Sequence, residues 1–172
     1  PLFEPRVFGS WLLHQHTRAL ALDFFIVNSS LLSLLGSAGQ ANYTASAAFL
    51  DALVAHRRAQ GLPAMAINWC AWSGGGLATL SGARGEAMWS SLGHAFISPD
   101  AGMRAFDQAM HRDIDHIAVA AADWRTYSGK IGNPPFLSEL VNISAVVSEP
   151  APRRAEPQRV VEPQRVVAVD AG

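Results

Sequence analysis

Apolar residues recur along this chain with two periods, and each period predicts a different kind of element. A spacing of three to four residues, which places side chains on one face of a helix, recurs in four segments. These segments predict helices at about 7–21, 41–60, 84–92 and 98–110. Ser98-Pro99-Asp100 is typical of a helix start, and Gly61-Leu62-Pro63 of a helix end.

Three short apolar runs alternate with these helices and predict strands, and the middle run suits a strand that is buried on both faces. They are Phe24–Asn28, Ala64–Trp69 and His116–Ala121. Strands that alternate with helices of this length favour an α/β fold, a doubly wound parallel sheet with helices on both faces. The first half of such a sheet carries a G-x-G-x-x-G turn for a dinucleotide, and the sequence has none. Either the fold is different, or the chain holds only the C-terminal half of it.

The last part of the chain has a different composition, rich in Pro, Arg, Glu and Val. The hexapeptide Glu156–Val161 is repeated at once as Glu162–Val167. Such a segment buries too little apolar surface to order itself, and its prolines favour an extended spacer. We therefore expect a folded portion over residues 1–143 and a disordered linker over 144–172, with a peptide docking motif as the alternative for the linker.

Composition restricts the possible functions. The chain has 172 residues, 49% of them hydrophobic, which is material for one core, and a formal net charge of −1. The charge argues against nucleic acid or an anionic membrane surface as a partner. The single Cys and the lack of a leader-like start favour the cytoplasm, and the apolar runs fall short of the roughly 20 residues that span a bilayer. Because Pro1 leads almost directly into a helix, we expect the chain to be part of something longer.

Candidate chemistry follows the first strand. Ser30 comes at its end, and Tyr43 follows thirteen positions later at the head of the long helix. Ligands of open parallel sheets bind at the carboxyl ends of the strands, so both hydroxyls are expected near one ligand. A phenol can protonate a developing alkoxide, and a Ser hydroxyl can stabilise the same oxygen. The alternative is a loop Ser and a half-buried Tyr without catalytic roles. The six His show no metal-ligand spacing, and we expect no metal site.

Many short motifs along residues 5–140 resemble, in order and spacing, the ketoreductase domains of modular type I polyketide synthases, which are members of the short-chain dehydrogenase/reductase superfamily. The motifs are Phe24–Ser30, Leu35–Tyr43, Ala48–Leu53, Arg57–Ala64, Ile67–Trp69, Trp72–Leu77, Ser98–Gly102 and Asp123-Trp124. The resemblance implies the C-terminal half of a Rossmann-like sheet. The dinucleotide turn is then expected in an N-terminal half of the domain, upstream of Pro1.

The resemblance also implies an activity. The family uses NADPH to reduce the 3-keto group of an acyl chain that is tethered through phosphopantetheine to an acyl carrier protein. By position, Tyr43 corresponds to the proton donor and Ser30 to its partner at the carbonyl. Trp72, Gly74 and Gly75 fall where a cofactor-binding segment is expected, and the stretch from Gly74 to Trp89 resembles a lid over substrate and nicotinamide.

Two positions depart from the family pattern. The catalytic Lys, which contacts the cofactor ribose, corresponds to Arg6, and the Asn four residues after the Tyr corresponds to Ala47. Arg keeps the positive charge but not the compact ammonium, and Ala makes no side-chain hydrogen bond. Ser46 points in another direction on the helix and does not replace the Asn. The sequence therefore leaves a second hypothesis, a redox-inactive remnant that serves as a structural scaffold within a polyketide synthase.

Overall fold

The computed structural model describes residues 3–75 and 82–146 of the chain. Its elements follow in the order η1 (Glu4–Phe8), α1 (Gly9–Thr17), β1 (Ile26–Ser30), α2 (Leu32–Leu35), α3 (Ala41–Ala59), β2 (Met65–Trp69), α4 (Gly82–Ser91), β3 (His94–Ala95), α5 (Pro99–Met110), β4 (His116–Val119), β5 (Ala121–Ala122), α6 (Trp124–Lys130), η3 (Pro135–Leu137) and α7 (Ser138–Val146). Most of the predicted linker, residues 147–172, lies outside the described residues, and its first three residues continue α7.

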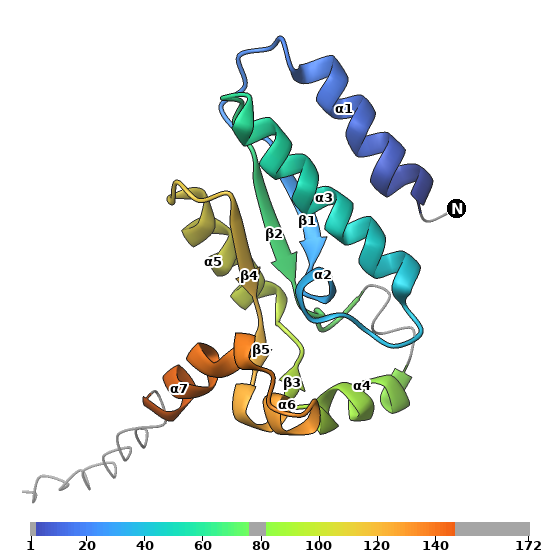
Figure 1. Ribbon diagram of the computed structural model, residues 1–172, viewed down its shortest axis with the longest axis vertical. Coiled ribbons are helices and arrows are strands. Elements are labelled where there is room, and N and C mark those ends of the chain that lie inside the picture. The colour runs from blue at the N-terminus through green and yellow to red at the C-terminus, as the bar shows by residue number, and fades with distance from the viewer. Residues whose placement is uncertain (1–2, 76–81, 147–172) are drawn as a thin grey trace, which may run out of the picture.

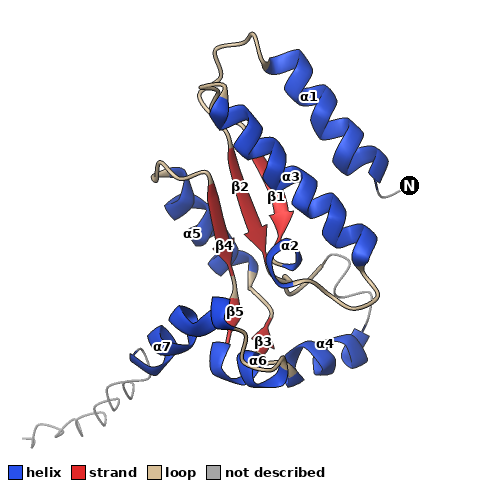
Figure 2. Ribbon diagram, in the orientation of Figure 1, coloured by secondary structure: helices blue, strands red, loops and turns tan. Residues whose placement is uncertain are grey.

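A parallel sheet of three strands forms the centre of the molecule, in the order β1-β2-β4. Helix α3 crosses one face of this sheet and α5 lies on the other (Figures 1 and 2). The three strands are the three that the sequence predicts, so the α/β fold with a parallel sheet is confirmed. The carboxyl ends of all three strands point toward the same edge, which is the edge that carries the candidate site.

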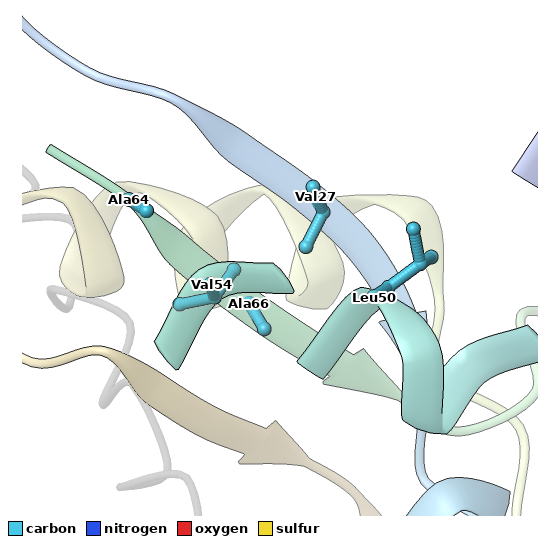
Figure 3. Packing of buried hydrophobic residues seen from close by; sticks show 5 residues of the cluster. All are labelled: Val27, Leu50, Val54, Ala64 and Ala66. Carbon is cyan, nitrogen blue, oxygen red and sulfur yellow. The ribbon is translucent and has the colours of Figure 1, made fainter. Parts of the chain in front are cut away.

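Two small cores hold the helices against the sheet. Val27 and Ala66 face α3 and pack with Leu50 and Val54 (Figure 3). On the opposite face, buried Met65 and Ile67 of β2 pack with Ala109 of α5. Because side chains alternate between the faces of a strand, a run that is apolar at every position serves both cores at once.

Strand β1 lies two residues later than the sequence predicts. Its register pairs Ile26 with Met65 and Ser30 with Trp69, whereas Phe24 is 61% exposed. Hydrophobicity alone predicts a strand that begins at Phe24. The pairing of β1 with β2 instead continues past Val27, the last apolar residue of β1, as far as Ser30. Ser29 and Ser30 therefore belong to the strand itself, so the candidate site residue Ser30 lies in β1 and not in the loop after it.

Helix α1 lies beside α3 and is fixed to it by a buried arginine (Figure 1). Arg57 is fully buried, donates from Nη1 to Thr17 Oγ1 at 3.1 Å, and has its guanidinium over the Phe25 ring at 3.8 Å. The predicted first helix, residues 7–21, is observed as η1 and α1 over 4–17. A π-helical turn after Pro5 opens it, and it ends at Thr17, whose hydroxyl bonds back to Leu13 O.

A second, antiparallel pair of strands, β3 and β5, was not predicted. The predicted strand His116–Ala121 ends its pairing at Val119, and the chain then enters β5 to pair His94 with Ala122. Two-residue strands carry no periodic pattern, which is why the sequence does not reveal them. Within the described ranges, no helix has the length and apolar character needed to cross a membrane.

Candidate functional site

Ser30 closes β1 at the carboxyl edge of the sheet, where it is 5% exposed. Its Oγ accepts a hydrogen bond from the backbone N–H of Leu32 at 3.2 Å, because the chain turns into α2 directly after the strand. This bond uses a lone pair of the oxygen and leaves the hydroxyl proton for another acceptor. The Ser30 hydroxyl is thus oriented, and its O–H can donate one hydrogen bond.

Tyr43 lies in the first turn of α3 and is half-buried. Its side chain and that of Ser30 line the same cavity, of about 250 Å³. The other walls are largely apolar and include Leu31, Trp89 and Phe96. The structure therefore brings the two residues that the sequence singles out to one cavity, and no hydrogen bond joins their side chains among the described residues.

Arg6 of η1 contacts the ring of Tyr43. Its guanidinium carbon lies 4.7 Å from the centre of the Tyr43 ring, so the cation stacks on the face of the phenol. Nε and Nη2 of Arg6 are buried and have no hydrogen-bond partner among the described residues. Buried donors are normally satisfied, so these two nitrogens are an exception among the described side chains.

Ala47 lies one helical turn beyond Tyr43 and is completely buried. Its backbone carbonyl accepts a hydrogen bond from Ser29 Oγ at 3.2 Å, which ties α3 to β1. The neighbouring Ser46 donates its hydroxyl to Tyr43 O at 2.7 Å, within its own helix. As expected from the sequence, Ser46 does not provide the polar side chain that is missing at position 47.

A buried polar network lies beneath the site, and the sequence did not single it out. Asn68 Nδ2 of β2 donates to Ser33 Oγ at 2.8 Å and to the Asp51 carboxylate at 3.0 Å. Ser33 also donates to Asp51, so α2, α3 and β2 are joined at one point. One polar residue in the otherwise apolar run Ala64–Trp69 was the available signal. The network holds the turn after Ser30 in place.

The predicted cofactor residues Trp72, Gly74 and Gly75 lie apart from this cavity. The Trp72 ring packs edge-on against Trp69 at 4.9 Å and lines a separate hollow with Asn28, Met103 and Phe106. Gly74 and Gly75 are exposed, and no atom of the described residues lies within 4 Å of a Cβ built on either. Of the lid-like stretch from Gly74 to Trp89, residues 76–81 lie outside the described part of the chain.

Two further ionisable groups line the cavity. Burial raises the pKa of the Cys70 thiol and lowers the pKa of the His94 imidazole, so both groups favour their neutral forms. His94 was not singled out from the sequence, because nothing nearby in the chain marks it. Across the described ranges, three or more His, Cys, Asp or Glu side chains do not gather in a way that could hold a metal ion.

The fold of this chain is similar to that of solved ketoreductase structures. A structure of A-type ketoreductases from a modular polyketide synthase matches with a TM-score of 0.74 and 30% identity, over 82% of this chain and 30% of that one. The first ketoreductase of the tylosin synthase matches with a TM-score of 0.65 and 41% identity, over 73% of this chain and 27% of that one. The Rossmann-like fold is therefore shared, and this chain spans under a third of each structure.

Sequence comparisons agree. The spectinabilin polyketide synthase system protein of Streptomyces orinoci is 41% identical over 154 residues, covering 87% of this chain and 7% of that protein. Mycoketide-CoA synthase of Mycobacterium tuberculosis is 38% identical over 149 residues, covering 82% of this chain and 4% of that protein. The chain thus spans a small fraction of the length of these multidomain relatives.

A family model described as the KR domain matches residues 1–74, which include Arg6, Ser30 and Tyr43. The match therefore covers the part of the fold in which the candidate site begins. Together with the solved structures and the relatives, it identifies the family. The chain is part of a ketoreductase domain of the polyketide synthase family.

Proposed function

We propose that this chain supplies the catalytic hydroxyls of a domain that reduces a 3-ketoacyl group, carried on an acyl carrier protein, to the 3-hydroxyacyl group with NADPH. The observation that supports this most is the shared cavity of Ser30 and Tyr43 at the carboxyl edge of the sheet. It is where open parallel sheets bind their ligands, and its apolar walls suit an acyl chain.

Ser30 and Tyr43 have different roles at the keto oxygen. Ser30, oriented by the Leu32 N–H, donates its free proton to the carbonyl oxygen and holds it in place. Tyr43 delivers a proton to the same oxygen as it gains negative charge during reduction. Arg6 stacks on the phenol ring and restricts its orientation. Mostly apolar walls limit the access of water to the reacting carbonyl.

The described residues fit one end of NADPH. Arg6, whose guanidinium lies over the Tyr43 ring, is a permanent cation of the kind that binds the hydroxyl or phosphate oxygens of a nucleotide. NADPH, when bound, supplies the hydride for the keto carbon. The G-x-G-x-x-G turn that holds the pyrophosphate does not occur in this sequence, so we assign that contact to an N-terminal half of the domain. The Trp72, Gly74 and Gly75 segment stays a prediction for cofactor contact.

The partner is an acyl carrier protein whose phosphopantetheine arm brings the substrate as a thioester. The test is the formation of 3-hydroxyacyl thioester by the intact synthase module, with and without NADPH, from a 3-ketoacyl pantetheine thioester. NADPH-dependent formation of product that disappears in Ser30→Ala supports the proposal. Product formation that is unchanged in that variant contradicts it.

A second candidate is a redox-inactive domain that acts as a scaffold between catalytic modules. Two observations favour it: the Arg6 cation lies over the ring face, and Ala47 is buried with no polar side chain. Loss of one oriented donor typically costs about 10²- to 10³-fold in rate. A silent parent module whose activity returns in Arg6→Lys/Ala47→Asn supports the scaffold, whereas a parent that reduces the thioester rules it out.

A further inference from the structure

Asp51 of α3 connects the two parts of the chain that carry Ser30 and Tyr43. It lies about two helical turns after Tyr43 on the same helix. Both oxygens of its carboxylate lie 3.0 Å from Asn68 Nδ2, and Ser33 Oγ donates to Oδ2. Ser33 belongs to the short helix α2 that follows Ser30. Asp51 therefore joins the helix of one candidate hydroxyl to the strand end that carries the other.

The carboxylate sets the direction of the hydrogen bonds around it. An ionised carboxylate only accepts, so the amide nitrogen of Asn68 must face Asp51. Asn68 is 1% exposed, and the same nitrogen lies 2.8 Å from Ser33 Oγ and 3.3 Å from Ser30 O. A neutral amide in place of the carboxylate could face Asn68 either as a donor or as an acceptor. The negative charge thus favours one arrangement of this network over the others.

The turn after Ser30 depends on this network. Ser33 Oγ lies 2.8 Å from Ser30 O and also within hydrogen-bond distance of the Asp51 carboxylate, so one hydroxyl joins the strand end to α3. The same turn brings the Leu32 N–H to Ser30 Oγ at 3.2 Å, which is the bond that orients the hydroxyl. The backbone of α3 is fixed at the same residue, because His116 Nε2 of β4 lies 3.1 Å from Asp51 O.

We propose that Asp51 is a positioning residue that sets the placement of the Ser30 hydroxyl relative to Tyr43. The inference rests on the proposed function, because that reaction requires both hydroxyls at one keto oxygen. Asp51 is not one of the described residues that line the cavity, so it acts through Ser33 and Asn68 and not on the substrate. Its removal should therefore lower the rate of reduction at saturating substrate more than it changes substrate binding.

The test is steady-state reduction of a 3-ketobutanoyl pantetheine thioester by the intact ketoreductase domain with NADPH. We expect Asp51→Asn, which keeps the shape of the side chain but not its charge, to lower kcat about tenfold and to leave KM within about twofold. Asp107→Asn, the same exchange at an exposed position on α5, is the matched control and should equal the parent. Rates are normalised to the folded fraction, measured by urea unfolding, so that a loss of stability does not appear as a lower kcat.

A second measurement does not depend on turnover. The Leu32 amide donates to Ser30 Oγ, so its NMR signal reports how that hydroxyl is held. Asp51→Asn should shift this signal, and Asp107→Asn should leave it in place. If the parent reduces the thioester, an unchanged kcat in Asp51→Asn overturns the inference and leaves the proposed function standing.

If the parent forms no product, the proposed function fails and the Leu32 signal decides the inference. A shift in Asp51→Asn then supports the placement of Ser30 by Asp51, and an unchanged signal overturns it. If Asp51→Asn does not fold, Ser33→Ala takes its place in both measurements with the same expected results, because it removes the hydroxyl between the Asp51 carboxylate and Ser30 O.

Discussion

The guanidinium carbon of Arg6 lies over the ring of Tyr43, 4.7 Å from its centre. A cation in this position stabilises and orients the ring. The ammonium group of a lysine would interact differently, because it is a compact charge with three rotatable N–H donors. Under the proposed function, the contact between these two residues sets the surroundings of the proton donor.

Arg6→Lys is expected to raise kcat for thioester reduction by about tenfold or more in the intact domain, because an ammonium replaces an imperfect donor at the reacting end. The measurement is steady-state NADPH oxidation at saturating substrate. Arg104→Lys, an exposed substitution on α5, is the matched control and should leave kcat unchanged. A lower kcat in Arg6→Lys would mean that the stacked guanidinium is the functional arrangement.

Arg57→Lys should destabilise the protein although the charge is kept. Arg57 is fully buried and donates from Nε to Pro63 O at 3.3 Å and from Nη1 to Thr17 Oγ1 at 3.1 Å. A lysine cannot make this fork, so we expect a loss of about 2–3 kcal/mol in the free energy of unfolding, measured with urea. Arg58→Lys alters an exposed ion pair with Asp113 and should barely move the midpoint.

Acidification should destabilise the junction of α1 and α3 through His14. Burial, and then the Arg57 charge, lower the pKa of His14, and Arg57 Nη1 donates to its Nδ1, so the ring is neutral in the fold. Its unfolded pKa is about 6.5, so the unfolded chain takes up the proton first as the pH falls. The contribution of the neutral His14 to the free energy of unfolding is therefore fully present above pH 6.5 and is lost as the pH falls below that value.

Urea unfolding at pH 8 and pH 5.5 checks this prediction. His14→Gln should show a smaller decrease between the two pH values than the parent, since one of the groups that titrate has been removed. Part of the decrease should remain, because burial lowers the pKa of His94 in the same direction. An equal decrease in parent and variant would contradict the role given to His14.

Gly102→Ala should disturb the packing of α5 on Trp72. A Cβ at Gly102 would lie 2.3 Å from the Trp72 ring, and the tryptophan is held between α5 and Trp69. We expect a loss of about 1–3 kcal/mol in the free energy of unfolding, the usual range for overpacking. Gly129→Ala in α6 is the control, because no atom of the part of the chain that the structure describes lies within 4 Å of a Cβ built there. Equal stability of both variants would show that Trp72 moves freely.

The sequence predicts those features of the fold and the site that depend on residues close together in the chain. Ser30 ends a strand and Tyr43 begins a helix, and the apolar pattern of the sequence predicts both elements. Their shared cavity follows because the chain passes from the carboxyl end of that strand to the start of that helix. The bounds of β1 were wrong by two residues, because pairing with β2, not hydrophobicity, sets where a strand ends. His94 lies 51 residues beyond Tyr43 on a two-residue strand. Only tertiary structure brings this residue to the wall of the cavity.

The central claim is that Tyr43 protonates the keto oxygen, and its phenol oxygen is the atom to remove. The measurement is the rate of 3-hydroxyacyl thioester formation by the intact domain with NADPH, for the parent and Tyr43→Phe. Phe keeps the ring that stacks on Arg6, so the fold should be unaffected. We predict a fall of about 10²-fold or more in kcat. A Tyr43→Phe variant that reduces the thioester as fast as the parent would contradict the account.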